Sequence, residues 1–314
     1  MPYAILAAIL VFQLGIILWL FSRVRKESLK PVAASNNSPQ TVSKFYNETT
    51  DKFLAVYGEI IQAFRTNDVS DYLQYTINSM QLKPGMKVID AGCGVCGPAC
   101  YFATAISDIA IEAITISDVQ AEKSKAKIQE RNLTGKVNVR LGDYHLLPQV
   151  FEKESYDLVY FLESFGHSND KRKAIHASWD VLKPGGKIYI KDLFLRESEN
   201  DWEQQRINVI AEQINRAYEY QIADFHEVVS ALRAKGFLIE FVRPPQVERD
   251  KFEHLTISND FQNLFNIGKI QSWDDYVFPI DFYEILAEKP RFNTADEIHL
   301  YFMNRLSAGQ QQAG

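Results

Sequence analysis

The residues with the clearest spacing for chemistry lie in a glycine-rich stretch, KVIDAGCGVCGPAC, at positions 87–100. Residues 88–90 are typical of the end of a buried strand. Gly92, Gly94 and Gly97 then follow with the spacing of a nucleotide-binding loop that opens a helix. Glycine suits such a loop because a Cβ would block a positive φ or the close approach of a ligand. The same spacing also occurs in ordinary strand-to-helix turns, so it does not identify the ligand by itself.

A carboxylate and an aromatic ring come together after the third predicted strand, in the sequence LGDY at 141–144. Asp143 and Tyr144 suit an adenine that is held by a hydrogen bond to its amino group and by stacking. A nicotinamide dinucleotide is less well matched, because its ribose is usually held by an acid at the tip of the second strand, about 20 residues after the glycines. That strand instead ends in ITIS, and Asp118 already lies at the start of the following helix.

The fourth predicted strand ends in a further group of reactive side chains, FLESFGH at 161–167. Ligands bind at the carboxyl edge of an open parallel sheet, which makes Glu163 and His167 candidate catalytic residues. Glu163 can orient a substrate or accept a proton through a bound water or bicarbonate, and His167 can act as a base near neutral pH. The structural alternatives are that Glu163 caps the following helix and that His167 only bonds the backbone.

The three cysteines of the chain, Cys93, Cys96 and Cys100, all lie in the glycine-rich stretch. An odd, clustered set does not form a disulfide framework. The order Cys-x2-Cys-x3-Cys is the reverse of the one that holds an iron–sulfur cluster in radical enzymes, and a fourth zinc ligand would have to come from elsewhere. A metal would also occupy the space that the glycines clear. We therefore expect no metal, and small apolar side chains that fill a reduced site.

Hydrophobic patterns alternate between strands and helices over most of the chain. Strands are predicted at 87–90, 109–116, 136–141, 156–162 and 187–193. Helices are predicted at 45–65, 71–80, 98–107, 117–132 and 170–182. This alternation predicts a parallel, doubly wound α/β sheet.

The ends of several elements are also predicted by local signals. Thr50 or Asp51 is expected to cap the helix at 45–65, and a turn is expected at 183–186. Further elements are expected as a long polar helical region at 197–222, a helix at 224–235, strands at 237–243 and 278–288, and a helix at 294–306. The helix at 224–235 begins with a capping box and ends at a glycine.

Composition places the chain among globular proteins with a sizeable core. It has 314 residues, 46% hydrophobic residues and a net charge of −6. The length suggests one large domain with additions, or two domains. The negative charge argues against non-specific binding to nucleic acid.

The amino-terminal stretch 3–21 carries no charge and is close to the ~20 residues that cross a bilayer. Basic residues follow it rather than precede it, which favours an uncleaved anchor over a signal peptide. We therefore expect a single-pass membrane protein with its catalytic body in the cytoplasm. The expected organisation is an anchor at 1–22, a linker at 23–44, a catalytic domain at 45–290 and a C-terminal helix and tail at 291–314.

Four ordered motifs carry a resemblance to a known family: DAGCG at 90–94, GDY at 142–144, YDLV at 156–159 and LKPGG at 182–186. With them the chain resembles the class I S-adenosylmethionine-dependent methyltransferases over about residues 45–290. The resemblance implies a mostly parallel, seven-stranded Rossmann-like sheet whose last strand is reversed and inserted between two others. It also implies S-adenosyl-L-methionine as the cofactor.

A subgroup is indicated by ITISDVQ at 114–120. It is similar to the stretch where sterol and geranyl diphosphate C-methyltransferases and cyclopropane synthases contact the cofactor ribose through Ser and Gln. Ser117-x-x-Gln120 is also an ordinary capping box, and the cysteines are atypical of the subgroup. The aromatic start of the helix at 45–65 resembles the helix that covers the cofactor there. The cofactor-binding residues that the resemblance implies are Tyr46, Asp90, Gly92, Cys93, Gly94, Thr115, Ser117, Gln120, Asp143, Tyr144 and Leu162.

Residues 197–222 and 252–276 interrupt the sheet pattern and carry aromatic residues, so we expect them to form a lid. An aromatic lid can stabilise the carbocation that forms when an alkene is methylated. The expected function is methyl transfer to carbon of a hydrophobic acceptor, an isoprenoid, a sterol or a related lipid. Methylation of nitrogen or oxygen in a small amine or quinone is an alternative, as is a membrane-tethered module that binds the cofactor without transfer.

Overall fold

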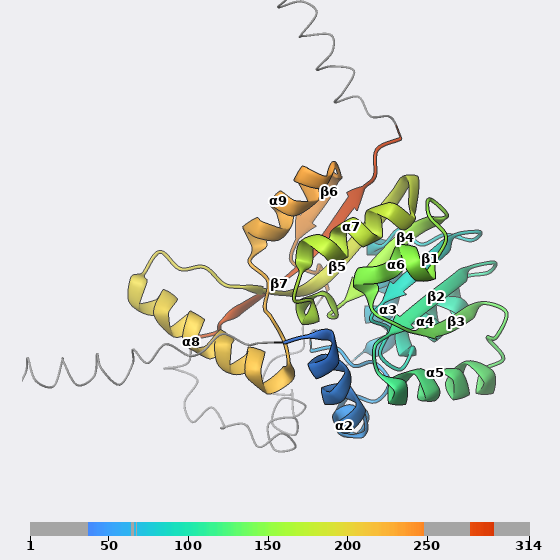
Figure 1. The fold of residues 1–314 in the computed structure, drawn as a ribbon, viewed down its shortest axis with the longest axis horizontal. Helices are drawn as coiled ribbons and strands as arrows, with labels where there is room; N and C mark the ends of the chain where they lie inside the picture. The colour runs from blue at the N-terminus through green and yellow to red at the C-terminus, as the bar shows by residue number, and fades with distance from the viewer. Residues whose placement is uncertain (1–36, 64–65, 67, 248–276, 292–314) are drawn as a thin grey trace, which may run out of the picture. The chain divides into compact units, whose positions relative to one another are not determined.

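The computed structural model describes residues 37–63, 66, 68–247 and 277–291. All of them belong to one compact unit, Ser35–Gly314 (Figure 1). The predicted anchor at 3–21, the second lid segment at 252–276 and the helix at 294–306 lie outside the described residues.

The core of the fold is a seven-stranded mixed sheet in the order β3-β2-β1-β4-β5-β7-β6. Its strands are β1 (Lys87–Ala91), β2 (Ala110–Thr115), β3 (Val137–Leu141), β4 (Tyr156–Leu162), β5 (Leu182–Leu195), β6 (Leu238–Arg243) and β7 (Ile280–Glu288). The first five strands run parallel, whereas β7 runs antiparallel to both β5 and β6. The predicted Rossmann-like sheet with a reversed, inserted last strand is confirmed.

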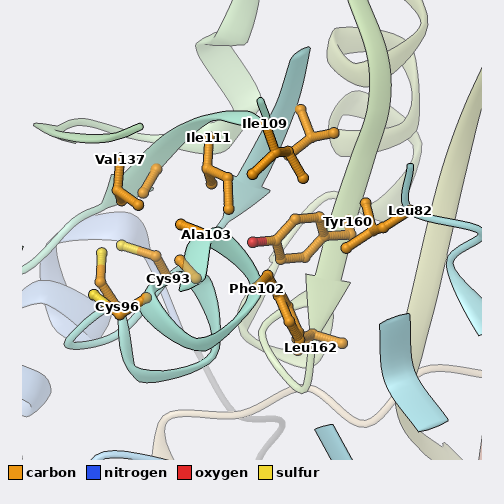
Figure 2. Close-up of a cluster of buried hydrophobic side chains, with 14 of the residues drawn as sticks. Leu82, Cys93, Cys96, Phe102, Ala103, Ile109, Ile111, Val137, Tyr160 and Leu162 are labelled. Carbon is orange, nitrogen blue, oxygen red and sulfur yellow. The ribbon is translucent and has the colours of Figure 1, made fainter. Parts of the chain in front are cut away.

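Helices cover both faces of this sheet. They are α2 (Pro39–Tyr57), α3 (Val69–Ser79), α4 (Gly97–Ala105), α5 (Asp118–Glu130), α6 (Leu147–Val150), α7 (Lys171–Val181), α8 (Asp201–Tyr218) and α9 (Phe225–Lys235), with short 3-10 turns η1 (Tyr144–Leu146) and η2 (Phe165–His167). One hydrophobic cluster joins α3, α4 and α5 to the sheet, and a second joins α7 and α9 to the opposite face. Tyr160 belongs to the first cluster (Figure 2) and its neighbour Phe161 to the second, because successive strand residues point to opposite faces.

The first described helix begins earlier than the sequence predicts. The helix expected at 45–65 is α2, and Ser38 caps it instead of Thr50 or Asp51. The Ser38 hydroxyl accepts from the Thr41 backbone N–H at 3.2 Å, and the Thr41 hydroxyl accepts from the Ser38 N–H at 2.8 Å. This reciprocal cap and the proline at the first helical position start the helix inside the predicted linker.

Other predicted boundaries agree more closely with the structure. Asp224 caps α9 by accepting from the Glu227 N–H at 2.7 Å, and Gly236 ends the helix at φ 107°. The polar region predicted at 197–222 contains α8. The turn expected at 183–186 is instead part of β5, and the short helices η1 and α6 were not predicted.

No helix in the described part of the chain has the length and apolar character that crossing a membrane requires. The prediction of a single-pass membrane protein is wrong on this finding. The stretch at 3–21 on which it rested lies among the residues that the structure does not describe.

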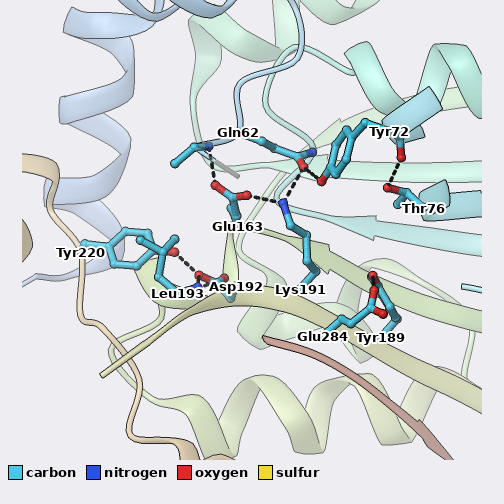
Figure 3. Close-up of polar contacts among 12 residues, drawn as sticks. Gln62, Tyr72, Thr76, Glu163, Tyr189, Lys191, Asp192, Leu193, Tyr220 and Glu284 are labelled. Atoms are coloured by element: carbon cyan, nitrogen blue, oxygen red, sulfur yellow. Dashed lines mark hydrogen bonds and ion pairs between the residues drawn. The ribbon is translucent and has the colours of Figure 1, made fainter. Parts of the chain in front are cut away.

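A fully buried carboxylate ties α3 to the far edge of the sheet. Glu284 of β7 accepts hydrogen bonds from the Tyr75 hydroxyl at 2.6 Å, the Tyr189 hydroxyl at 2.7 Å and Nε of Arg243 at 2.5 Å. Figure 3 shows Glu284 beside Tyr189. The Ser79 hydroxyl of α3 donates to the same carboxylate at 3.5 Å. This carboxylate therefore joins α3, β5, β6 and β7.

We expect Glu284→Gln to lower the free energy of unfolding by about 2–3 kcal/mol, because it removes a buried charge that several donors share. Urea unfolding of the full chain measures this. The matched control is Glu240→Gln on β6, whose ion pair with Lys187 is partly exposed, and we expect it to cost no more than about 1 kcal/mol. Equal losses in the two variants would contradict the assignment.

Candidate active site

A cavity opens at the carboxyl ends of the parallel strands, where the strand order changes direction between β1 and β4. It encloses about 890 Å³ of empty space, part of which is open to solvent. Ligands of open α/β sheets bind at this switch point. The predicted site residues that line it are Tyr46, Asp90, Gly92, Cys93, Gly94, Thr115, Gln120, Asp143, Tyr144, Leu162, Glu163 and His167.

Ser117 is the predicted site residue that the structure does not place on the cavity. It is fully buried and caps α5, where its hydroxyl accepts from the Gln120 N–H at 3.1 Å and donates to Oδ1 of Asn47 at 2.6 Å. The capping alternative therefore describes this side chain. Gln120 does reach the cavity, and its Oε1 accepts from the Thr115 hydroxyl at 2.8 Å.

The glycine-rich loop after β1 forms the floor of the cavity. The N–H groups of Gly92 and Cys93 both donate to the Ile114 carbonyl of β2, at 2.9 and 3.0 Å. Gly92 has φ 91°, and a Cβ there would lie 2.5 Å from Cβ of Ser164. Gly94 has φ 55°, and a Cβ there would meet nothing within 4 Å. Gly92 is therefore required for the close packing against Ser164, whereas Gly94 leaves open space where it lines the cavity.

Asp90 lies at the end of β1 under this loop and is buried. Burial raises the pKa of Asp90 to about 7, against an opposing effect of the Tyr160 hydroxyl. The carboxyl group is therefore poised between its two forms near neutral pH. A cation brought into the cavity would favour the ionised form.

Asp143 and Tyr144 follow β3 and are held by neighbouring polar groups. Oδ1 of Asp143 accepts from the His145 N–H at 2.9 Å and contacts Nδ1 of His145 at 2.6 Å. Burial acts to raise the pKa of Asp143, but the hydrogen bonds from His145 outweigh it and the pKa lies below its usual value. The Tyr144 hydroxyl donates to the Ser164 carbonyl at 3.1 Å. His145 also lines the cavity, and its position two residues after a strand-end acid was the signal that sequence reasoning passed over.

The hydrogen bonds of His167 determine its tautomer. Its Nδ1 lies 2.9 Å from the Glu219 carbonyl, which can only accept, so Nδ1 carries the hydrogen. Its Nε2 therefore accepts from the Tyr46 hydroxyl at 2.7 Å. Desolvation lowers the pKa of His167 to about 4, against the opposing bond to Glu219. The imidazole is neutral at pH 7, and both of its nitrogens are engaged.

Glu163 follows β4 with φ 55°, a left-handed conformation that is uncommon outside glycine. It does not cap the next turn, whose N-cap is Ser164. Its Oε1 forms an ion pair with Lys191, and its Oε2 accepts from the Ala63 N–H at 2.6 Å (Figure 3).

A neighbouring buried acid, Asp192, accepts from the Gly166 N–H at 3.0 Å and from the Tyr220 hydroxyl. Burial raises the pKa of Asp192 to about 6, although its hydrogen bonds act in the other direction. Sequence reasoning missed both Asp192 and Lys191. The signal was present as two adjacent charges in an otherwise apolar strand, KIYIKDL at 187–193.

The three cysteines are all buried in the hydrophobic cluster of Figure 2, and Cys93 also lines the cavity. Burial raises the pKa of Cys93 well above its usual value and that of Cys100 to about 11. The Cys93 and Cys100 thiols are therefore protonated at neutral pH. Within the described ranges, no group of His, Cys, Asp and Glu side chains has an arrangement that could hold a metal ion.

Comparison with known proteins gives this cavity a context. A family model described as a methyltransferase domain matches residues 89–190. The sterol 24-C-methyltransferase of Debaryomyces hansenii is 27% identical over 72% of this chain and 64% of its own length. An O-methyltransferase of Pyrenophora dematioidea is 35% identical over 38% of this chain and 43% of its own length. The chain thus spans less than two thirds of either relative.

Among solved structures, the [4+2]-cyclase SpnF superposes with a TM-score of 0.63 at 19% identity. The likeness covers 81% of this chain and 97% of that one. At this identity the comparison shows a shared fold.

We expect the His167 imidazole to titrate with a midpoint near 4 in an NMR pH series on the full chain, with His167→Gln to assign its signals. The unfolded chain binds this proton already near the ordinary pKa of 6.5, so stability falls as the pH drops from 6.5 towards 4. His167→Gln should remove that part of the acid sensitivity in urea unfolding. A midpoint above 6 would contradict the assigned tautomer and environment.

Proposed function

We propose that this chain, which belongs to the class I S-adenosylmethionine-dependent methyltransferases, transfers a methyl group to carbon of a hydrophobic acceptor, a sterol, another isoprenoid or a related lipid. The observation that carries the proposal is the cavity at the switch point of the sheet, around which the residues implied by the family motifs meet. The likeness to a sterol 24-C-methyltransferase over 72% of the chain supports the class of acceptor.

The residues of the cavity fit the cofactor. Open space at Gly94 leaves room for a ligand against the backbone. Asp90, with its pKa raised to about 7 by burial, would hold the ammonium group and become fully ionised. The hydrogen bonds of Asp143 within the described residues use Oδ1, so Oδ2 would take the adenine amino group beside the Tyr144 ring. When bound, the cofactor supplies an electrophilic methyl group on a sulfonium.

The acceptor end of the cavity is formed by Tyr46, Glu163 and His167. Methylation of an alkene carbon leaves a carbocation that must lose a proton. The Glu163 carboxylate and the face of the Tyr46 ring stabilise this positive charge. Because the Tyr46 hydroxyl donates to Nε2 of His167, the proton passes to the Tyr46 oxygen as its own hydrogen moves to His167. The Ile61 and Gln62 wall helps to keep water away from the cation.

The strength of this base is sufficient for the proposed reaction. Desolvation lowers the pKa of His167 to about 4, which makes it a weak base. A weak base is enough for a carbocation, because a carbocation gives up a proton readily.

A second candidate function is O-methylation of a small hydroxylated molecule. It is favoured by the likeness to an O-methyltransferase, which is closer in identity, 35%, but extends over only 38% of this chain. Asp192, with a pKa raised to about 6 by burial, lies close behind this end of the cavity, where it accepts from the Gly166 N–H, and could serve as the base in that reaction.

We expect Gly94→Val to weaken binding of S-adenosylmethionine by roughly ten- to hundredfold, because the new side chain fills the ligand's space. Isothermal titration calorimetry on the full chain measures the affinity. Gly85→Val is the matched control, since Gly85 also has a positive φ, 82°, but lies in the turn before β1. Both variants carry the same kind of backbone strain, so a similar loss of affinity in both would count against the cavity as the cofactor site.

Incubation of the full chain with lipid extract and cofactor labelled with carbon-13 in the methyl group should give an apolar product heavier by one methylene. The carbon-13 chemical shift of the product should be that of a methyl bound to carbon. A methyl bound to oxygen would favour the O-methyltransferase alternative. Calorimetric binding without any labelled product would favour a module that binds the cofactor without transfer.

A further inference from the structure

The side chain of Lys191 is buried within β5, a strand with neighbours on both sides. Lys191 is in β5, in register with Leu162 of β4, and is 1% exposed. Placing an ammonium group in such a position is costly unless it is paired and hydrogen-bonded. The contacts of the Lys191 side chain therefore indicate its role.

The ammonium of Lys191 joins two parts of the cavity wall. It forms an ion pair with Oε1 of Glu163 and donates to Oε1 of Gln62 at 3.0 Å. It also lies 5.0 Å from the centre of the Tyr72 ring, and the Tyr72 hydroxyl donates to the same Gln62 oxygen at 2.5 Å. Figure 3 shows these side chains converging from α3, β4, β5 and the segment after α2.

Residues 59–63, here called the connector segment, form one wall of the cavity through Glu59, Ile61 and Gln62. One end is fixed where the Glu59 carboxylate pairs with Lys127 at 2.6 Å. The other end is fixed on the ion pair, through Gln62 to Lys191 and through the Ala63 N–H to Oε2 of Glu163. The Glu163–Lys191 ion pair thus holds this end of the connector segment in place.

We propose that Lys191 is a positioning residue for the proposed methyl transfer: through its ion pair with Glu163 and its hydrogen bond to Gln62, it holds the connector segment in place over the cavity. The inference rests on the proposed function only in taking this cavity as the place of transfer.

The charge of Lys191 supports this role. Burial acts to lower the pKa of Lys191, but the Glu163 charge outweighs it and the pKa is raised. The ammonium is therefore protonated at neutral pH and donates to both Glu163 and Gln62.

The first test is Lys191→Met in the full chain, with hydrogen exchange measured at the Ala63 amide. The substitution removes the hydrogen bond to Gln62 and the ion pair that holds Glu163 beside Ala63, so we expect exchange at least about tenfold faster than in the wild-type chain. Lys187→Met on the same strand is the matched control, since Lys187 pairs with Glu240 away from the cavity. An unchanged exchange rate in a folded Lys191→Met variant would overturn the proposal.

The second test covers the connector segment and does not depend on whether Lys191→Met folds. Gln62→Leu keeps the ion pair but removes one of its two links to the connector segment, the hydrogen bond from Lys191. We expect hydrogen exchange at the Ala63 amide to be about tenfold faster in Gln62→Leu than in Lys187→Met, the loss of roughly one hydrogen bond. An unchanged exchange rate would overturn the positioning role.

Neither readout requires turnover. A chain that methylated no lipid could still show both effects, and an active methyltransferase could show neither. Failure of the positioning role and failure of the proposed function are therefore distinguishable. Where turnover is found, we expect Lys191→Met to lower kcat/KM and Lys191→Arg, which keeps a cation beside Glu163, to recover part of that loss.

Discussion

The turn after β1 is the constraint on which the rest of the site depends. Two successive N–H groups, of Gly92 and Cys93, bond to one carbonyl of β2, so the loop is fastened to the neighbouring strand before α4 begins. The loop must then pass Ser164 at a distance that no Cβ would permit at Gly92. Strands β1, β2 and β4 are thereby locked together at their carboxyl ends, and the cavity is the space left above them.

Much of the fold and of the cofactor end of the site could be predicted from the sequence, because both depend on patterns among residues that are close together in the chain. Alternating apolar runs fixed the parallel strands, and the residue after each strand was known to lie on one edge of the sheet. That reasoning reached Asp90, Asp143 and Glu163 without knowledge of any tertiary contact. At Ser117 the spacing fits both a helix cap and a ribose contact, and the structure shows the cap.

The remaining parts depend on partners distant in sequence. Gln62 and Lys191 are 129 residues apart, and nothing near either one indicates the other. The start of α2 was missed because Ser38 and Thr41 lie in a small, polar stretch that is also typical of a linker. His167 was predicted as a base near neutral pH, but the contacts that desolvate it come from α2 and from the end of α8.

The two adjacent charged residues of β5, Lys191 and Asp192, lie beside the cavity, and their contacts there account for their presence in a buried strand. Lys191 and Asp192 are adjacent, so their side chains leave the strand on opposite faces, one towards Glu163 and the other towards Tyr220. Two charges in a central strand cost desolvation free energy that apolar residues of similar size would avoid. Charged residues replace apolar ones in a buried strand mainly where a functional site uses their charges. The two acids at this edge of the sheet differ in environment, since Glu163 faces an ammonium while the pKa of Asp192 is raised by burial. The carboxylate that faces the ammonium is also the one that lines the cavity, where it can stabilise a positive charge.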